Sequence, residues 1–361
     1  MPTQATSTIA RWGWALLIGL IGCRDRPRAT EPLPARPPTL AAAVRRGVQN
    51  RGCESCHAAI AREWLGSRHR QAATNLEFAT AFRDEPDPFC WSCHAPEAPS
   101  PTVSASAGES ALAGAGVACV TCHVDAQGAT HGASREPRFG APHAVLRDAA
   151  FQRVASCGAC HEFAFPDPAR ERREMMQTTL SEHSRSAFSD ASCADCHMPR
   201  QGSDRHRSHA FASTRDPSAI ARAVRVVAER DAGVVRIHVS PERVGHAFPT
   251  GDLFRRLRVT AEVVVAGRVV RREQRFLARH FARRAQQSGA LRRELSYDDR
   301  PGASAEHGGA VAVELDLASF AVERPIRWQV SYERVQHLQG DGEDEATVAG
   351  SVLLASGELL P

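Results

Sequence analysis

The chain has 361 residues, of which 24% are charged, and its formal net charge is +4 at pH 7. A net charge this small excludes proteins that bind nucleic acid through a strongly basic surface. All 45 basic residues are arginine, which forms bidentate contacts with carboxylates. What narrows the function is the placement of the 11 cysteines and 16 histidines.

Residues 1–22 have the pattern of a lipoprotein signal peptide. The apolar run 12–22 follows Arg11 and is shorter than the roughly 20 residues that a membrane-spanning helix needs. It leads into Leu20-Ile21-Gly22-Cys23, which is typical of a bacterial lipobox, so we expect cleavage before Cys23 and acylation of its thiol. The alternative is an ordinary signal peptide followed by an incidental cysteine. Both interpretations predict export, and acylation adds a lipid anchor to a bacterial membrane.

The remaining chain divides into three parts by composition. Residues 23–45 are rich in proline and arginine, which predicts an extended tether. Residues 46–215 contain the other ten cysteines, and residues 216–361 contain none. We expect an α+β protein: a mostly helical and looped N-terminal domain at 46–215 and an antiparallel β-sandwich-like domain at 216–361.

Five copies of the motif Cys-x-x-Cys-His lie within residues 46–215. Their cysteines are Cys53, Cys56, Cys90, Cys93, Cys119, Cys122, Cys157, Cys160, Cys193 and Cys196. Their histidines are His57, His94, His123, His161 and His197. This motif is the attachment signature of heme c, in which two thiols bond to the vinyl groups and the histidine binds the iron. We therefore predict five covalently attached hemes.

Zinc sites and disulfides are the other common uses of paired cysteines. A closed zinc site takes two Cys-x-x-Cys pairs or two additional histidines, whereas these pairs are odd in number and each precedes a histidine. A disulfide framework would not require that histidine. The pattern therefore favours heme, and the arginines are suited to pair with heme propionates.

The motifs begin at residues 53, 90, 119, 157 and 193, which leaves too little chain for an ordinary core around each cofactor. We expect short helices and long loops packed on the porphyrins, with a helix at 58–65 and a surface loop at 95–116. A weak internal repeat aligns Glu63-x-x-x-Ser67 with Glu182-x-x-x-Ser186. The repeat indicates duplication of a heme unit.

The second axial position of each heme decides whether it transfers electrons or binds substrate. The candidate ligands are His69, His131, His143, His183, His206, His209 and His246, with Met175 and Met176 as alternatives. The favoured set is His69, His131, His183, His209 and His246. If residues 57–69 are helical, His57 and His69 lie about 18 Å apart, so His69 is expected to bind a neighbouring heme. The other histidines, His238, His280, His307 and His337, are expected to have no role at the metal.

Period-two alternation begins after about residue 216 and predicts half-buried antiparallel strands. The runs lie at 235–239, 257–265, 311–317, 326–330 and 347–354. Six or seven strands in roughly 145 residues suit one β-sandwich-like domain. Its turn at residues 245–251, Gly-His-Ala-Phe-Pro-Thr-Gly, projects His246 from a loop.

Several of these elements resemble the exported multiheme cytochromes of the cytochrome c554 type. They are the first motif followed by Trp64-x-x-Ser67-x-His69, Gly116-Val117-Ala118 before the third motif, and Met198-Pro199 after the fifth with His209-x-Phe211. The turn at 245–251 is similar to one in C-terminal β domains of related cytochromes. The resemblance implies bis-histidine hemes stacked in close pairs. This chain differs from that family in having five motifs and a β domain, so the order of the hemes in that family is not assumed for this chain.

We therefore expect an electron carrier or a conduit subunit in a respiratory or extracellular electron-transfer chain, anchored by lipid in the periplasm or at the cell surface. Its partners would be other redox proteins or a membrane electron-transfer complex. The alternative is a reductase of a small nitrogen or sulfur oxyanion with one open heme. Pentaheme nitrite reductases that use lysine at the active heme are excluded, because the chain has no lysine. No catalytic residue is assigned.

Overall fold

The computed structural model describes most of residues 39–361. The segments outside the description are 1–38, 85, 100–112, 134–141, 165–174, 202–205, 212–215, 252–254, 286–290 and 338–345. The predicted signal peptide, Cys23 and most of the predicted tether and of the loop at 95–116 lie outside the described residues. Within the described residues, no helix is long and apolar enough to cross a membrane.

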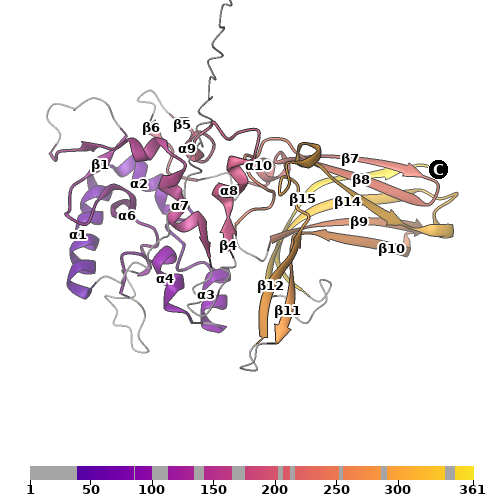
Figure 1. Cartoon of the computed structure of the whole chain (residues 1–361), viewed down its shortest axis with the longest axis horizontal. Helices are drawn as coiled ribbons and strands as arrows, with labels where there is room; N and C mark the ends of the chain where they lie inside the picture. The colour runs from indigo at the N-terminus through magenta and orange to yellow at the C-terminus, as the bar shows by residue number, and fades with distance from the viewer. Residues whose placement is uncertain are drawn as a thin grey trace, which may run out of the picture. The chain divides into compact units, whose positions relative to one another are not determined.

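Helices carry the five Cys-x-x-Cys-His motifs (Figure 1). α1 (Leu40–Cys56) ends at the second cysteine of the first motif, whereas each other motif closes a helix of five to seven residues. These helices are α4 (Pro88–His94), α6 (Cys119–His123), α7 (Ala155–His161) and α9 (Cys193–His197). Cysteines three residues apart on a helical turn lie on one face, so each motif presents its two thiols together.

α1 begins inside the segment expected to be a tether, which we predicted to end at residue 45. The hydroxyl of Thr39 accepts a hydrogen bond from the backbone N–H of Ala42 at 3.3 Å and caps the helix. The residues that follow are mostly good helix formers. Arg46 then donates to the carbonyl oxygen of Val120 at 2.8 Å, which attaches α1 to α6.

The rest of the N-terminal half has little apolar core of its own. Its other helices are α2 (Ala58–Leu65), as the periodicity predicts, α3 (Leu76–Asp84) and α8 (Thr179–Ser184). Its paired strands are β1 (His131–Gly132) with β2 (Leu146–Arg147), β3 (Glu162–Ala164) with β4 (Met175–Thr178), and β5 (Arg200–Gln201) with β6 (His206–Arg207). A four-residue 3₁₀ helix spans Ala149–Gln152. The cluster of buried apolar side chains here contains Trp64, Ala118, Val120 and Val124.

The C-terminal half is antiparallel β structure, as the alternation predicts. After α10 (Pro217–Ala221), one sheet has the order β13-β8-β7 and the other β10-β9-β14-β15, and β11 pairs with β12 as a separate hairpin. The strands are β7 (Val224–Asp231), β8 (Val234–Pro241), β9 (Arg255–Val265), β10 (Arg268–Leu277), β11 (Arg279–Ala285), β12 (Leu291–Asp298), β13 (Val311–Asp316), β14 (Ile326–His337) and β15 (Thr347–Leu359).

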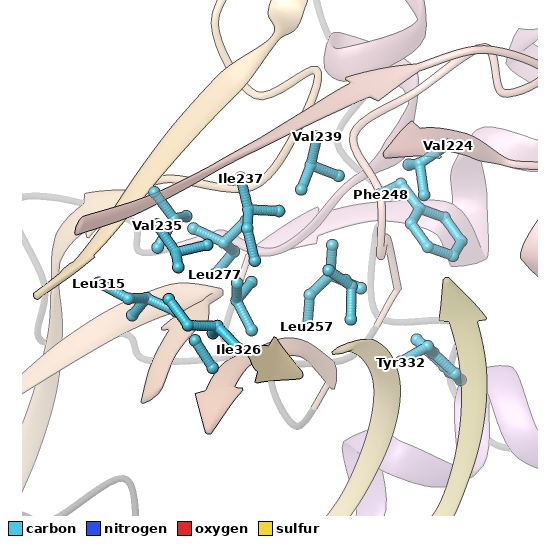
Figure 2. Close-up of a cluster of buried hydrophobic side chains, with 14 of the residues drawn as sticks. Val224, Val235, Ile237, Val239, Phe248, Leu257, Leu277, Leu315, Ile326 and Tyr332 are labelled. Carbon is cyan, nitrogen blue, oxygen red and sulfur yellow. The ribbon is translucent and has the colours of Figure 1, made fainter. Parts of the chain in front are cut away.

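Side chains of the two larger sheets form one core, shown in Figure 2. Val235, Ile237 and Val239 alternate along β8 and are fully buried, whereas the residues between them are partly exposed. They belong to the same cluster as Leu257 of β9 and Ile326 of β14. Each such side chain stabilises the fold by about 1.5–3 kcal/mol relative to its exposed state. The β domain therefore has a core independent of any cofactor.

Candidate functional site

None of the ten described cysteines forms a disulfide, and sulfur atoms of different motifs lie close together. Hydrogen bonds or electrostatic interactions join Cys93 with Cys160, Cys157 with Cys193, Cys53 with Cys119, and Cys122 with Cys157. The third motif is thus adjacent to the first and fourth, and the fourth to the second and fifth. Cofactors bound at these thiols would lie next to one another, which suits transfer of electrons between them.

Four of the five motif histidines face the ring of a second histidine across a constant distance. The ring centroids are 6.3 Å apart in two pairs and 6.2 Å apart in the other two. The pairs are His57 with His143, His161 with His69, His123 with His209, and His197 with His246. A metal–nitrogen bond of about 2 Å on each side, plus about 1.1 Å from nitrogen to ring centre, gives roughly 6.2 Å. The spacing therefore fits one iron between each pair of rings.

Several of these rings have one nitrogen already engaged by the backbone. His123 Nδ1 lies 2.9 Å from the carbonyl oxygen of His131, and His209 Nδ1 lies 2.8 Å from that of Arg207. His246 Nδ1 lies 2.9 Å from the carbonyl oxygen of Ala247. A hydrogen bond from Nδ1–H to a carbonyl fixes the tautomer in which Nε2 carries the lone pair. Nε2 is then the nitrogen available to a metal.

Burial favours the neutral, metal-binding form of six of the eight paired rings. Burial, with help from His161, His197 and His209, lowers the pKa of His69 to about 4. Burial also lowers the pKa of His246 to about 4. The same cause lowers the pKa of the rings of His123, His161, His197 and His209. Histidines with these pKa values are uncharged at neutral pH.

Three of the five favoured distal ligands, His69, His209 and His246, lie opposite a motif histidine. His69 faces His161 and not His57, in agreement with the helix-length argument. The fourth partner is His143, which the sequence offered as a candidate but did not favour. His143 lies just before β2 in a segment with no distinguishing motif. Its residue type was therefore the only signal in the sequence that it could be a distal ligand.

The structure places the other candidate ligands elsewhere. His131 Nε2 lies 2.9 Å from Asp125 Oδ2, and its Nδ1 lies 3.7 Å from Asp148 Oδ2. His206 Nε2 lies 2.9 Å from Glu63 Oε1. The ring of His183 packs beside Gly245, where a Cβ atom would lie 3.3 Å from His183 Cδ2. His131 and His206 therefore contact carboxylates, and His183 flanks the loop that carries His246.

The carbonyl oxygens of Met175 and Met176 both accept hydrogen bonds from Arg279, the latter at 2.7 Å. These contacts fix the backbone of β4 against β11 of the C-terminal half.

The ring of His94 stacks on a phenylalanine and its Nδ1 lies near a backbone carbonyl oxygen, as do the ring and Nδ1 of His123. The His94 ring stacks on Phe78, with centroids 3.8 Å apart and planes inclined by 10°, and its Nδ1 lies 2.7 Å from the carbonyl oxygen of Ala72. Trp91, in the same motif, has a buried Nε1 without a hydrogen-bond partner in the described part of the chain. A buried indole N–H requires an acceptor, and a heme propionate is of the right kind. The motif residues thus fit heme c in their thiols, their imidazoles and this donor.

Two comparisons with known proteins find multiheme cytochromes similar to this chain. Residues 45–210 match the family described as outer membrane cytochrome MtrC/MtrF-like, domains II/IV. The chain is also similar in structure to a penta-heme cytochrome c552 from Thermochromatium tepidum, with a TM-score of 0.62 and 18% sequence identity. That similarity covers 86% of this chain and 97% of the other, and at this identity it concerns the fold. No curated protein matches the chain.

Proposed function

We propose that this chain is a multiheme c-type cytochrome that transfers electrons through five covalent hemes in an exported electron-transfer chain. The observation that supports the proposal best is the set of four imidazole pairs at 6.2–6.3 Å. Two imidazole ligands make an iron six-coordinate and low-spin, the state suited to electron transfer.

We assign the ten motif cysteines to thioether bonds and the five motif histidines to proximal positions. His143, His209, His69 and His246 are the distal ligands for the hemes of the first, third, fourth and fifth motifs. The chain's own residues then do three things: they attach each heme, fix the orientation of both imidazoles, and keep neighbouring hemes close. The thiol contacts between motifs support an order in which the fourth motif joins the second, third and fifth.

Anchoring at Cys23 and a position in the periplasm or on the cell surface are part of the same proposal. The lipobox pattern supports the anchor, and the description of the matched family as outer membrane cytochromes supports exposure outside the cytoplasm. The partners would be redox proteins of the periplasm or a membrane electron-transfer complex. The β domain, which has its own core, would then serve as a docking unit that also supplies His246.

Intact-mass analysis and electron paramagnetic resonance of the mature oxidised protein test this function. We expect five heme additions that survive denaturation, with at least four low-spin signals. Fewer than five additions in fully matured protein would overturn the heme count. A majority of high-spin hemes would overturn the bis-histidine assignment and with it the electron-transfer role.

A further inference from the structure

The sequence repeat that aligns Glu63 with Glu182 has a structural counterpart. Each glutamate is the third residue from the end of a short helix, α2 or α8. Each matched serine, Ser67 or Ser186, lies just beyond the helix and donates its backbone N–H to the carbonyl oxygen three residues earlier, at 2.8 and 3.0 Å. The two segments therefore place an equivalent carboxylate at an equivalent point of a helix.

Glu63 holds the segment that carries His209. Its Oε2 accepts a hydrogen bond from the backbone N–H of His209 at 2.8 Å, and its Oε1 lies 2.9 Å from His206 Nε2. The His209 ring is oriented separately, through Nδ1 and the carbonyl oxygen of Arg207. Glu63 thus fixes the backbone position of His209, and the carbonyl of Arg207 fixes the rotation of its ring.

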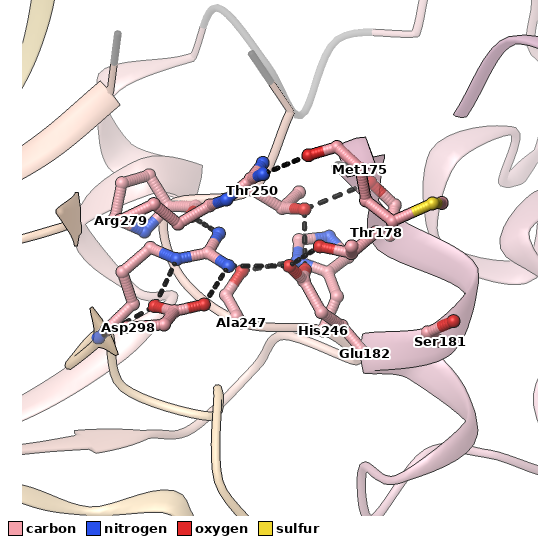
Figure 3. A network of polar contacts seen from close by, with 12 residues as sticks. Met175, Thr178, Ser181, Glu182, His246, Ala247, Thr250, Arg279 and Asp298 are labelled. Carbon is pink, nitrogen blue, oxygen red and sulfur yellow. Dashed lines mark hydrogen bonds and ion pairs between the residues drawn. The ribbon is translucent and has the colours of Figure 1, made fainter. Parts of the chain in front are cut away.

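Glu182 holds the loop that carries His246, although the loop belongs to the C-terminal half (Figure 3). Its Oε2 accepts a hydrogen bond from Thr250 Oγ1 at 2.6 Å, and its Oε1 accepts one from Thr178 Oγ1 at 2.7 Å. Glu182 is 2% exposed, so these contacts are shielded from water. The carboxylate therefore attaches α8 to the end of the loop four residues after His246.

Arg300 completes the attachment from the other side of the loop. Its guanidinium donates to Glu182 Oε1 at 2.7 Å and to the carbonyl oxygen of Pro249 at 2.5 Å. Asp298 Oδ2 lies 2.7 Å from the same guanidinium and balances its charge. The backbone N–H of Phe248 also donates to the carbonyl oxygen of Pro301 at 2.8 Å. The loop is thus fixed at three consecutive residues, 248–250, which begin two residues after His246.

We propose that Glu63 and Glu182 are positioning residues, each of which holds the distal histidine of one heme: His209 opposite His123, and His246 opposite His197. The proposal rests on the axial pairs assigned above. Among the described residues, no hydrogen bond joins either carboxylate to the imidazole it serves. Each acts through the backbone or through a neighbouring hydroxyl, so its effect is on where the ring lies.

Loss of such support weakens a metal–ligand bond without removing the ligand. Changes in the residues that orient metal ligands typically lower affinity by about 10–100-fold. Glu63→Ala should therefore lower the affinity of the His209 imidazole for its iron, and Glu182→Ala that of the His246 imidazole. Each variant should convert part of one heme to the high-spin form and allow the reduced protein to bind carbon monoxide there.

The experiment compares these variants in the mature holoprotein by electron paramagnetic resonance and carbon monoxide titration. His209→Ala and His246→Ala serve as references for complete loss of each ligand. Glu314→Ala, on the outer face of β13 in an ion pair with Arg236, removes a carboxylate away from the hemes. Because Glu182→Ala removes one of the two carboxylates paired with the buried Arg300, Thr250→Val provides a milder variant that removes one hydroxyl donor only.

Double variants test which distal histidine each glutamate positions. Glu63→Ala combined with His209→Ala should show no more high-spin heme than His209→Ala alone, whereas Glu63→Ala combined with His246→Ala should show the sum. Glu63→Gln, whose amide oxygen can still accept the His209 N–H, should recover most of the low-spin signal. If the histidine references change the spectra but the glutamate variants and Thr250→Val do not, the positioning role is wrong. If the histidine references themselves have no effect, the axial pairs are wrong instead.

Discussion

His197 and His246 lie with ring centroids 6.2 Å apart and planes inclined by only 17°, although they come from different halves of the chain. His197 closes the fifth motif at the end of α9, whereas His246 lies in the loop between β8 and β9. One iron between them would make the fifth heme a covalent and coordinate link between the two halves. The β domain would then be part of a heme site.

His246→Ala should convert one heme from low to high spin, because it removes the imidazole opposite His197. The optical and paramagnetic spectra measure this change, and the reduced variant should gain carbon monoxide binding at one heme. His238→Ala is the matched control, since His238 lies on β8 of the same domain and contacts Glu229 at 3.2 Å. Unchanged spectra in His246→Ala would show that this histidine is only a turn residue.

His143→Ala and His131→Ala should differ, although both histidines lie between the third and fourth motifs. The ring of His143 faces that of His57 at 6.3 Å, whereas His131 contacts Asp125 at 2.9 Å. We therefore expect a new high-spin heme in His143→Ala and a spectrum close to that of the parent in His131→Ala. Paramagnetic resonance of the two variants measures the difference. The reverse result would restore His131 as the distal ligand that the sequence favoured.

The proposed sites of heme attachment can be predicted from the sequence because their chemistry is local. Two thiols and a histidine within five residues act on one cofactor, so no knowledge of the fold is needed. Distal ligands come from remote segments, and sequence reasoning could only list candidates. Helix length excluded His69 as a ligand of the same iron as His57. The choice between His131 and His143, however, depends on which of them lies near Asp125 and which near His57.

Strands of the β domain can be predicted from the sequence where only one face of the strand is buried. Val235, Ile237 and Val239 alternate with exposed residues on β8, and this strand was identified. β10 was not, because six of its ten residues are exposed and its charged residues lie on both faces. The contact of Glu182 with Arg300 could not be predicted either, since 118 residues separate the partners. The weak repeat with Glu63 is the only signal in the sequence that distinguishes Glu182 from other glutamates.

Cys23→Ser should release the protein from membranes. The thiol of Cys23 is the proposed attachment point of the lipid, and the described residues contain no helix suited to span a membrane. Cell fractionation with heme staining measures the distribution between membrane and soluble fractions. Mutation of a heme cysteine, for example Cys56→Ser, should lower heme content without releasing the protein. A Cys23→Ser protein that stays with the membrane as firmly as the parent would exclude lipid as the main anchor.

Arg300→Met should destabilise the protein strongly, because it leaves the Glu182 carboxylate buried without its counter-charge. Glu182 and Arg300 are 2% and 3% exposed, and breaking such a pair from one side costs about 3–5 kcal/mol of unfolding free energy. Denaturant unfolding of the holoprotein followed by circular dichroism measures this loss. An exposed pair provides the control: Glu314→Gln, which breaks the contact with Arg236, should leave the unfolding midpoint nearly unchanged.

The same pair predicts how stability depends on pH. Burial raises the pKa of Glu182, but the charge of Arg300 and the hydroxyls of Thr250 and Thr178 outweigh it, so the net shift is downward. A carboxyl whose pKa is lower in the folded than in the unfolded protein contributes its full stabilisation above the unfolded value, about 4.3 for glutamate, and loses it as the pH falls through the folded value. The unfolding free energy of the parent should therefore fall below about pH 4 more steeply than that of Glu182→Gln. Equal slopes in the two proteins would mean that Glu182 is not ionised in the folded state, and that the Arg300 guanidinium is balanced by Asp298 alone.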